Sequence, residues 1–125
     1  MLIYAGGAFA QSLVSIKDSV AYARYQSRPK TQLSELVYLM DRFNVPGVEI
    51  KVDGDTFNAE KAFPYWKISL SVSYEKETAQ DWVRRYCYRS DQTNKVIYMR
   101  VNGGDCKPAR DVFLEELKRL RDLIK

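Results

Sequence analysis

TAQDWVRRYCYRS, residues 78–90, combines a helix start, an apolar face and a dense basic surface. Thr78 followed by Asp81 is a variant of the capping box, in which side-chain oxygens accept hydrogen bonds from free N–H groups of the first turn. A helix is therefore expected to begin here. Five apolar residues then recur at helical spacing and predict one buried face: Ala79, Trp82, Val83, Tyr86 and Cys87.

From the same spacing, a second group of residues is expected to point away from the core: Arg84, Arg85, Tyr88 and Arg89. Arg and Tyr are enriched at binding hot spots, and Arg forms bidentate pairs with carboxylates. These four residues are the candidate partner-binding residues, and an acidic surface on another protein is what they would suit. The alternative is a solvated helix face whose arginines pair with acidic neighbours.

Upstream of this stretch, two further helices are expected. In residues 11–26, four apolar residues lie near helical spacing: Leu13, Ile16, Val20 and Ala23. Thr31 then caps a second helix, whose apolar face comprises Leu33, Leu36, Val37, Met40 and Phe43. Its polar face comprises Glu35, Asp41 and Arg42.

Residues 44–77 are expected to form two strands, a turn and a short helix. Residues 48–52 alternate as a strand, and Asp53-Gly54-Asp55 follows as a turn. Asn58 is expected to cap a short helix that Pro64 bends or ends. After it, apolar residues alternate with Lys or Ser and predict a second strand: Ile68, Leu70, Val72 and Tyr74.

Oxygen-bearing side chains surround the turn at residues 53–55 and raise the question of a calcium site: Asp53, Asp55, Asn58 and Glu60. The spacing does not fit the EF-hand loop, in which glycine is sixth and glutamate twelfth. A turn and a helix cap account for the same residues, so no metal site is predicted.

A third strand at residues 95–101 and a closing helix from Pro108 complete the expected elements. The closing helix has Val112, Phe113, Leu117, Leu120 and Ile124 on one face. The fold class is therefore α+β, with a small antiparallel or mixed sheet of about three strands packed by about four helices. At 125 residues and 46% hydrophobic composition, residues 11–125 are expected to form a single domain.

The charge of the chain permits an anionic partner without requiring one. Lys and Arg number 20 and Asp and Glu 16, giving a net charge of +4, and the two signs are interleaved. A nucleic-acid or other polyanion binder is the alternative function, because basic residues accompany five aromatic residues that could stack on bases: Tyr65, Trp66, Tyr86, Tyr88 and Tyr98.

The absence of histidine from the sequence removes histidine-dependent catalysis and imidazole metal ligation. Cys87 would lack a histidine to activate it, and Asp53, Asp55 and Glu60 lie around a turn. We therefore expect no catalytic residues, no metal and no cofactor. The two cysteines, Cys87 and Cys106, could form a disulfide or remain two free thiols.

The first ten residues, MLIYAGGAFA, contain Ala8-Phe9-Ala10, the small-x-small pattern of a signal-peptidase site. Residues 1–10 are thus interpreted as the remnant of an export signal or as a packed N-terminal segment. The first interpretation predicts a periplasmic or secreted protein and the second is compatible with a cytoplasmic one. No apolar run is long enough to span a bilayer.

Several segments together resemble the YfeK-like family of small exported proteobacterial proteins, whose function is not established. The likeness lies in residues 33–40 (LSELVYLM), 59–62 (AEKA), 78–83 (TAQDWV) and 114–120 (LEELKRL), in that order and at matching distances. Where the family has a histidine and a lysine, this chain has Tyr65 and Ser69. The resemblance implies export to the periplasm and no enzymatic activity.

Together these features predict a non-enzymatic exported protein that binds another macromolecule, for instance as an inhibitor or immunity-type partner of a secreted effector. The oligomeric state is not readable from the sequence.

Overall fold

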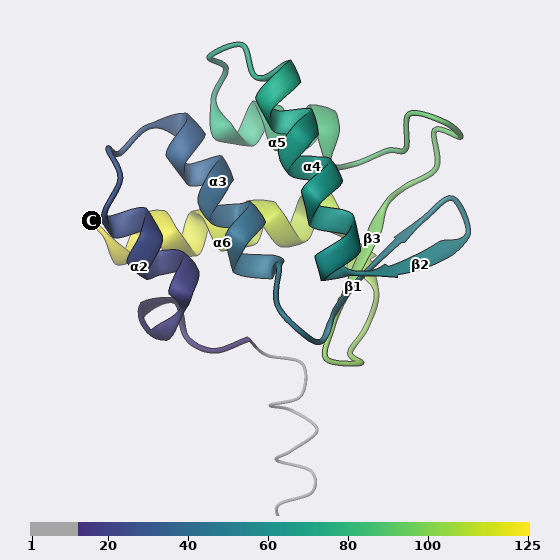
Figure 1. Ribbon diagram of the computed structural model, residues 1–125, viewed down its shortest axis with the longest axis horizontal. Coiled ribbons are helices and arrows are strands. Elements are labelled where there is room, and N and C mark those ends of the chain that lie inside the picture. Colours follow the sequence, from purple (N-terminus) through teal and green to yellow (C-terminus); the bar gives the residue numbers. More distant parts are fainter. Residues whose placement is uncertain (1–12) are drawn as a thin grey trace, which may run out of the picture.

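The computed structural model describes residues 13–125. Helix α3 (Gln32–Phe43) is the centre of its helical part (Figure 1). Four α-helices pack against it: α2 (Val20–Gln26), α4 (Ala59–Ser73), α5 (Ala79–Tyr86) and α6 (Ala109–Leu123). A short 3-10 helix, η1 (Ile16–Asp18), precedes α2. The proposed signal remnant, residues 1–10, lies outside the described residues.

A four-stranded antiparallel sheet lies beside the helices, in the order β2-β1-β3-β4. Its strands are β1 (Val48–Val52), β2 (Asp55–Asn58), β3 (Tyr98–Val101) and β4 (Lys107–Pro108). Asp53 and Gly54 form the two-residue turn between β1 and β2, with φ angles of 54° and 85°. Two positive φ values in a two-residue turn match the right-handed twist of the hairpin strands.

The α+β class is confirmed. Within residues 13–125 there are five α-helices and four strands, where about four and about three were expected. Strands β2 and β4 were not predicted, because each is too short to show an apolar alternation. Strand β1 was predicted at its observed bounds, and its Val48 and Ile50 are buried.

The strand predicted around residues 68–74 is wrong, because this stretch forms the last turns of α4 and its C-cap. Pro64 does not end the helix, since its missing N–H removes only one intrahelical hydrogen bond in the second turn. Leu70 is buried with Phe63, whereas Ile68 and Val72 are exposed. The alternation therefore arose from a helix with apolar residues on both its inner and outer faces.

Helix α3 is buried on more sides than its pattern predicted. Leu36, Met40 and Phe43 are buried as expected, but Leu33 is exposed. Two residues of the predicted polar face, Glu35 and Arg42, are buried as well. Four neighbouring helices surround α3, so its charged residues face ion-pair partners on α6 instead of solvent.

The apolar stripe predicted for residues 11–26 is also wrong in part. Helix α2 begins only at Val20, with Ser19 as N-cap, and it buries Ala21 and Tyr25. Val20 and Ala23 are exposed. A helix of seven residues is too short for its inner face to be identified from spacing alone.

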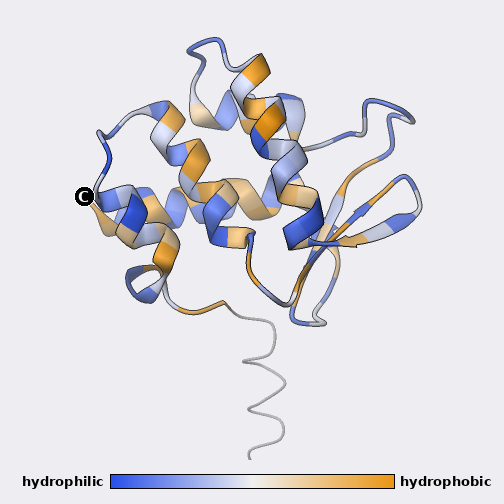
Figure 2. Cartoon of the chain, viewed as in Figure 1, coloured by the Kyte–Doolittle hydropathy of each residue, from blue (hydrophilic) through white to orange (hydrophobic). Residues whose placement is uncertain are grey.

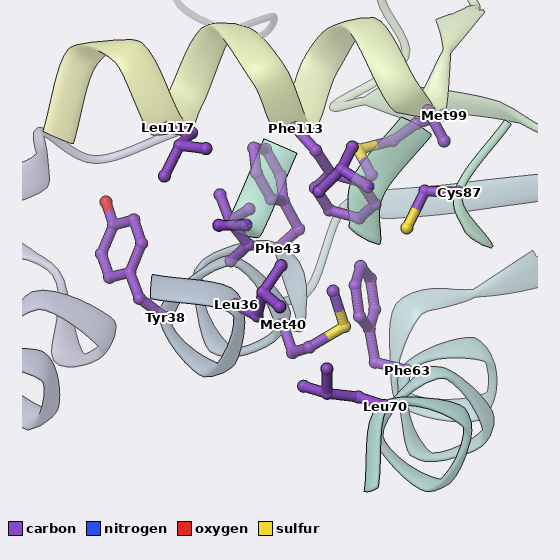
Figure 3. Packing of buried hydrophobic residues seen from close by; sticks show 14 of the residues in the cluster. Leu36, Tyr38, Met40, Phe43, Phe63, Leu70, Cys87, Met99, Phe113 and Leu117 are labelled. Carbon is purple, nitrogen blue, oxygen red and sulfur yellow. The ribbon is translucent and has the colours of Figure 1, made fainter. Parts of the chain in front are cut away.

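One hydrophobic core joins the helices to the sheet (Figure 3). Phe113 of α6 is at its centre, with ring centroids of Phe43, Phe63 and Trp66 at 5.5, 6.2 and 5.3 Å. Met99 reaches the same cluster from β3. These aromatic contacts fix α4 against α6.

Candidate functional site

Helix α5 is held by its buried face, as its sequence predicted. Thr78 Oγ1 accepts a hydrogen bond from the N–H of Asp81 at 3.2 Å, which caps the first turn. Ala79, Trp82, Val83 and Cys87 are fully buried, and Tyr86 is half-buried. Because this face points into the core, Arg84 and Arg85 on the opposite side are exposed.

The four candidate residues come together on one surface. Helix α5 ends at Tyr86, earlier than expected, so Tyr88 and Arg89 belong to the segment that leads to β3. Within this segment Arg89 forms an isolated antiparallel β-bridge with Val96. The four residues, which we call the arginine face, line one shallow depression of about 480 Å³: Arg84, Arg85, Tyr88 and Arg89.

The Tyr88 ring contacts the guanidinium groups of Arg89 and Arg110, and sequence spacing did not predict that these two groups lie together. The guanidinium carbon of Arg89 lies 4.8 Å from the centroid of the Tyr88 ring, and that of Arg110 lies 3.7 Å from it. Arg110 is in the first turn of α6, far from Tyr88 in the sequence, and no local pattern could have identified it. Cation–π contact of this kind holds the planar groups in place.

The arginines of this face are weakly paired within the protein. Arg84 Nη1 is 3.5 Å from Asp81 Oδ1, and Arg85 Nη1 is 3.8 Å from Glu77 Oε2. Both arginine side chains are more than half exposed. Exposed pairs at such distances contribute little, about 0–1 kcal/mol, so the charges remain accessible to a partner. Arg84 and Arg85 thus each have the acidic neighbour that the alternative interpretation predicted, and their guanidinium groups still remain exposed.

Asp53 anchors the segment that carries Arg89. Its carboxylate accepts hydrogen bonds from Ser90 Oγ, at 2.7 Å, and from Thr93 Oγ1. Arg89 in turn donates from Nη1 to the carbonyl oxygen of Asn94 at 3.0 Å. The tip of the β1–β2 hairpin and the segment at residues 87–97, which lie side by side at the right of Figure 1, are thus tied together.

The hydrogen bond from Thr93, and then that from Ser90, lowers the pKa of Asp53 from its ordinary value of 3.8. These bonds are made to the ionised carboxylate, which explains the direction of the shift.

A second depression, which we call the α4 groove, adjoins the arginine face. It has a volume of about 540 Å³ and lies between α4, the β1–β2 hairpin and residues 89–92. Ile50, Val52, Trp66 and Ile97 form much of its lining. Sequence analysis missed this groove, because the residues that line it come from four separate segments.

The other candidate chemical groups have structural partners or are buried. Cys87 points into the core near Phe63 and Met99 (Figure 3), and burial raises the pKa of its thiol well above the usual range. A neutral, buried thiol is a poor nucleophile. Cys106 is exposed, and both cysteines are free thiols, so they do not form a disulfide.

Three of the oxygen-bearing residues around the β1–β2 turn form hydrogen bonds within the protein: Asp53, Asn58 and Glu60. Asp53 accepts hydrogen bonds from Ser90 and Thr93, and Asn58 Nδ2 donates to Glu60 Oε1 at 3.3 Å. Asn58 is the N-cap of α4 as predicted, although its side chain makes no capping hydrogen bond. Across residues 13–125, no cluster of three or more potential Cys, Asp or Glu ligands is arranged to hold a metal ion.

Three of the five aromatic residues considered for base stacking line the α4 groove: Tyr65, Trp66 and Tyr86. The Trp66 ring packs against Phe63 and Phe113, and Tyr86 packs against Trp82 with ring centroids 5.2 Å apart. Tyr88 contacts two guanidinium groups. Tyr65 and Tyr98 are exposed, on α4 and β3 respectively. The polyanion-binding alternative thus stays a prediction.

Comparison with known proteins yields no relative: no family model, no curated protein and no solved structure matches this chain. The resemblance to the YfeK-like family thus stays a prediction from the order and spacing of its segments. None of the helices between residues 13 and 125 has the length and apolar character needed to cross a membrane.

Proposed function

We propose that this protein acts by binding a protein partner with an acidic surface, and that the arginine face is the binding site. The main support is geometric: Arg84, Arg85, Tyr88 and Arg89 line one depression, and the exposed side chains of Arg84 and Arg85 form long ion pairs. Guanidinium groups with free donors suit carboxylates. The role is non-enzymatic, for instance that of an inhibitor or immunity-type partner.

The restraint on Arg89 adds to this support. A binding residue contributes more when less freedom is lost on association. Arg89 is held by the Asn94 carbonyl and by Tyr88, and its segment is anchored at Asp53.

The experiment is affinity capture from envelope fractions, with wild type compared with the triple variant Arg84→Glu/Arg85→Glu/Arg89→Glu. A matched control reverses three lysines elsewhere, Lys17→Glu/Lys118→Glu/Lys125→Glu. Each set changes the net charge from +4 to −2, since every reversal lowers it by two. Lys118 is an exposed residue of α6, and Lys125 is the exposed last residue of the chain, whose C-terminus is marked at the left of Figure 1.

We expect a protein that is retained by wild type and by the control, and lost with the arginine variant. Recovery of nucleic acid alone, released by moderate salt, would instead support the polyanion-binding alternative. Equal loss in both variants would show that net charge matters and the arginine face does not.

Export to the periplasm is part of the proposal and is supported by the Ala8-Phe9-Ala10 pattern. Fractionation of the source cells followed by intact-mass measurement of the protein tests it. A periplasmic product shortened after Ala10 is expected, whereas a cytoplasmic product of full mass would contradict it.

A further inference from the structure

We propose that the α4 groove receives a large apolar side chain from the same partner segment whose acidic residues contact the arginine face. This inference rests on the proposed function and specifies the chemistry of the partner. The partner would carry a two-part element: a cluster of Asp or Glu residues followed, within a few residues, by one large aliphatic or aromatic residue.

The two depressions adjoin each other. Arg89, Ser90 and Asp91 line both of them, so a segment bound at the arginine face lies next to the groove. The anchoring of Ser90 to Asp53 fixes this shared border. Residues contributed by one extended segment could therefore occupy both sites.

The groove exposes apolar surface that the fold itself does not bury. Tyr65, at its edge on α4, is 77% exposed, and Phe57, on β2, is 37% exposed. The same side of α4 continues with Ile68 at 60% and Val72 at 80% exposure. Figure 2 shows the corresponding hydrophobic bands along α4. Exposed apolar residues gathered beside a concave surface are typical of interaction sites.

The charges of the groove determine which part of the partner enters it. Asp53, Asp55 and Asp91 line the groove together with Lys61 and Arg89, so carboxylates outnumber cations. An acidic side chain placed there would meet repulsion, whereas the arginine face has three arginines and only Asp91. The acidic residues of the partner therefore belong at the arginine face and its uncharged, apolar residue in the groove.

The test is selection of a random 12-residue peptide library displayed on phage by the full-length protein. Selected peptides are then synthesised, and their affinities are measured by fluorescence anisotropy. The groove variant is Tyr65→Ser. Its matched control is Val20→Ser, which also removes an exposed apolar side chain, on α2.

We expect the selected peptides to share an acidic cluster with a neighbouring apolar residue. Tyr65→Ser should weaken their binding about tenfold or more, as loss of an anchor contact does, while Val20→Ser leaves it unchanged. Replacing the apolar residue of the peptide with Ser should have a similar effect on wild type and almost none on Tyr65→Ser, because the two residues share one contact.

The possible failures are distinguishable. Acidic peptides without an apolar preference, or equal effects of Tyr65→Ser and Val20→Ser, would overturn the groove inference and leave the arginine face intact. Peptides without acidic residues, or binding that Arg84→Glu/Arg85→Glu/Arg89→Glu does not weaken, would overturn both proposals. A wild-type dimer in sedimentation that Tyr65→Ser converts to a monomer would show that a second copy covers the groove, and would overturn the inference.

Discussion

Trp82 determines which side of α5 faces solvent, because its side chain fixes the rotation of the helix. The residue is fully buried, and its indole N–H donates to Ser73 Oγ at 3.0 Å. Trp82→Ala would leave a cavity and remove the hydrogen bond that Ser73 Oγ accepts. We expect it to lower the free energy of unfolding by about 3–5 kcal/mol in urea denaturation.

The control for Trp82 is Arg84→Ala on the outer side of the same helix. It should change the free energy of unfolding by less than about 0.5 kcal/mol, since its ion pair with Asp81 is exposed. A loss of under about 1 kcal/mol for Trp82→Ala would place this residue at the surface. The assignment of the arginine face would then be wrong.

Glu116 forms the most deeply buried charged contact of the described residues. Its Oε2 accepts hydrogen bonds from Tyr38 Oη at 2.6 Å and from Arg42 Nε at 2.9 Å. Burial, and then the hydrogen bond to Glu116, raises the pKa of Tyr38 far above its ordinary value, so the phenol remains protonated and donates. Glu116→Gln would leave the Arg42 charge buried without its counterion.

We therefore expect Glu116→Gln to lower the free energy of unfolding by about 3–5 kcal/mol, measured by urea denaturation at neutral pH. The neighbouring Glu115→Gln is the matched control, because Glu115 pairs with Arg119 on the exposed side of α6. Its effect should stay below about 1 kcal/mol. Equal effects of the two substitutions would contradict the buried ion pair.

At the scale of elements, the β1–β2 hairpin supports the segment that carries Arg89. The link is the Asp53 carboxylate, whose pKa is lowered by hydrogen bonds from Thr93 and Ser90. A lowered pKa in the folded state means that this contribution to stability is present above the unfolded-state pKa. It is lost as the pH falls through the folded-state pKa.

Asp53→Asn tests this link, because Asn tolerates the positive φ of this position but carries no charge. The difference in free energy of unfolding between wild type and variant should be constant above about pH 5 and shrink once the pH falls below the ordinary value of 3.8. Urea denaturation from pH 3 to pH 7 measures it. A difference that is the same at all pH values would show that the ionised carboxylate does not hold this segment.

Elements with a local signal were predictable from the sequence, and those set by tertiary contacts were not. Thr78 caps α5 and Asp53-Gly54 turns the hairpin because side-chain and backbone chemistry at those positions suffices. The second half of α4 was mistaken for a strand because its outer face is apolar too, at Ile68 and Val72. Periodicity identifies a helix only when one of its faces is polar.

At the scale of the whole molecule, only the part of the candidate site that lies on one helix was predictable from the sequence. Arg84 and Arg85 followed from the buried face of α5. Arg110 joins Tyr88 only because α6 packs against α5. The α4 groove depends on the placement of α4 beside the β1–β2 hairpin, and no spacing within one segment encodes that.

The measurement that tests the central proposal most directly is site-specific photo-crosslinking in intact cells. A benzoylphenylalanine residue replaces Tyr88 in one variant and the exposed Lys118 of α6 in the other. We predict a discrete protein adduct from position 88 that Arg84→Glu/Arg85→Glu abolishes, and no such adduct from position 118. An adduct from position 118 alone, or crosslinks from position 88 only to nucleic acid, would contradict the proposal that the arginine face binds an acidic protein partner.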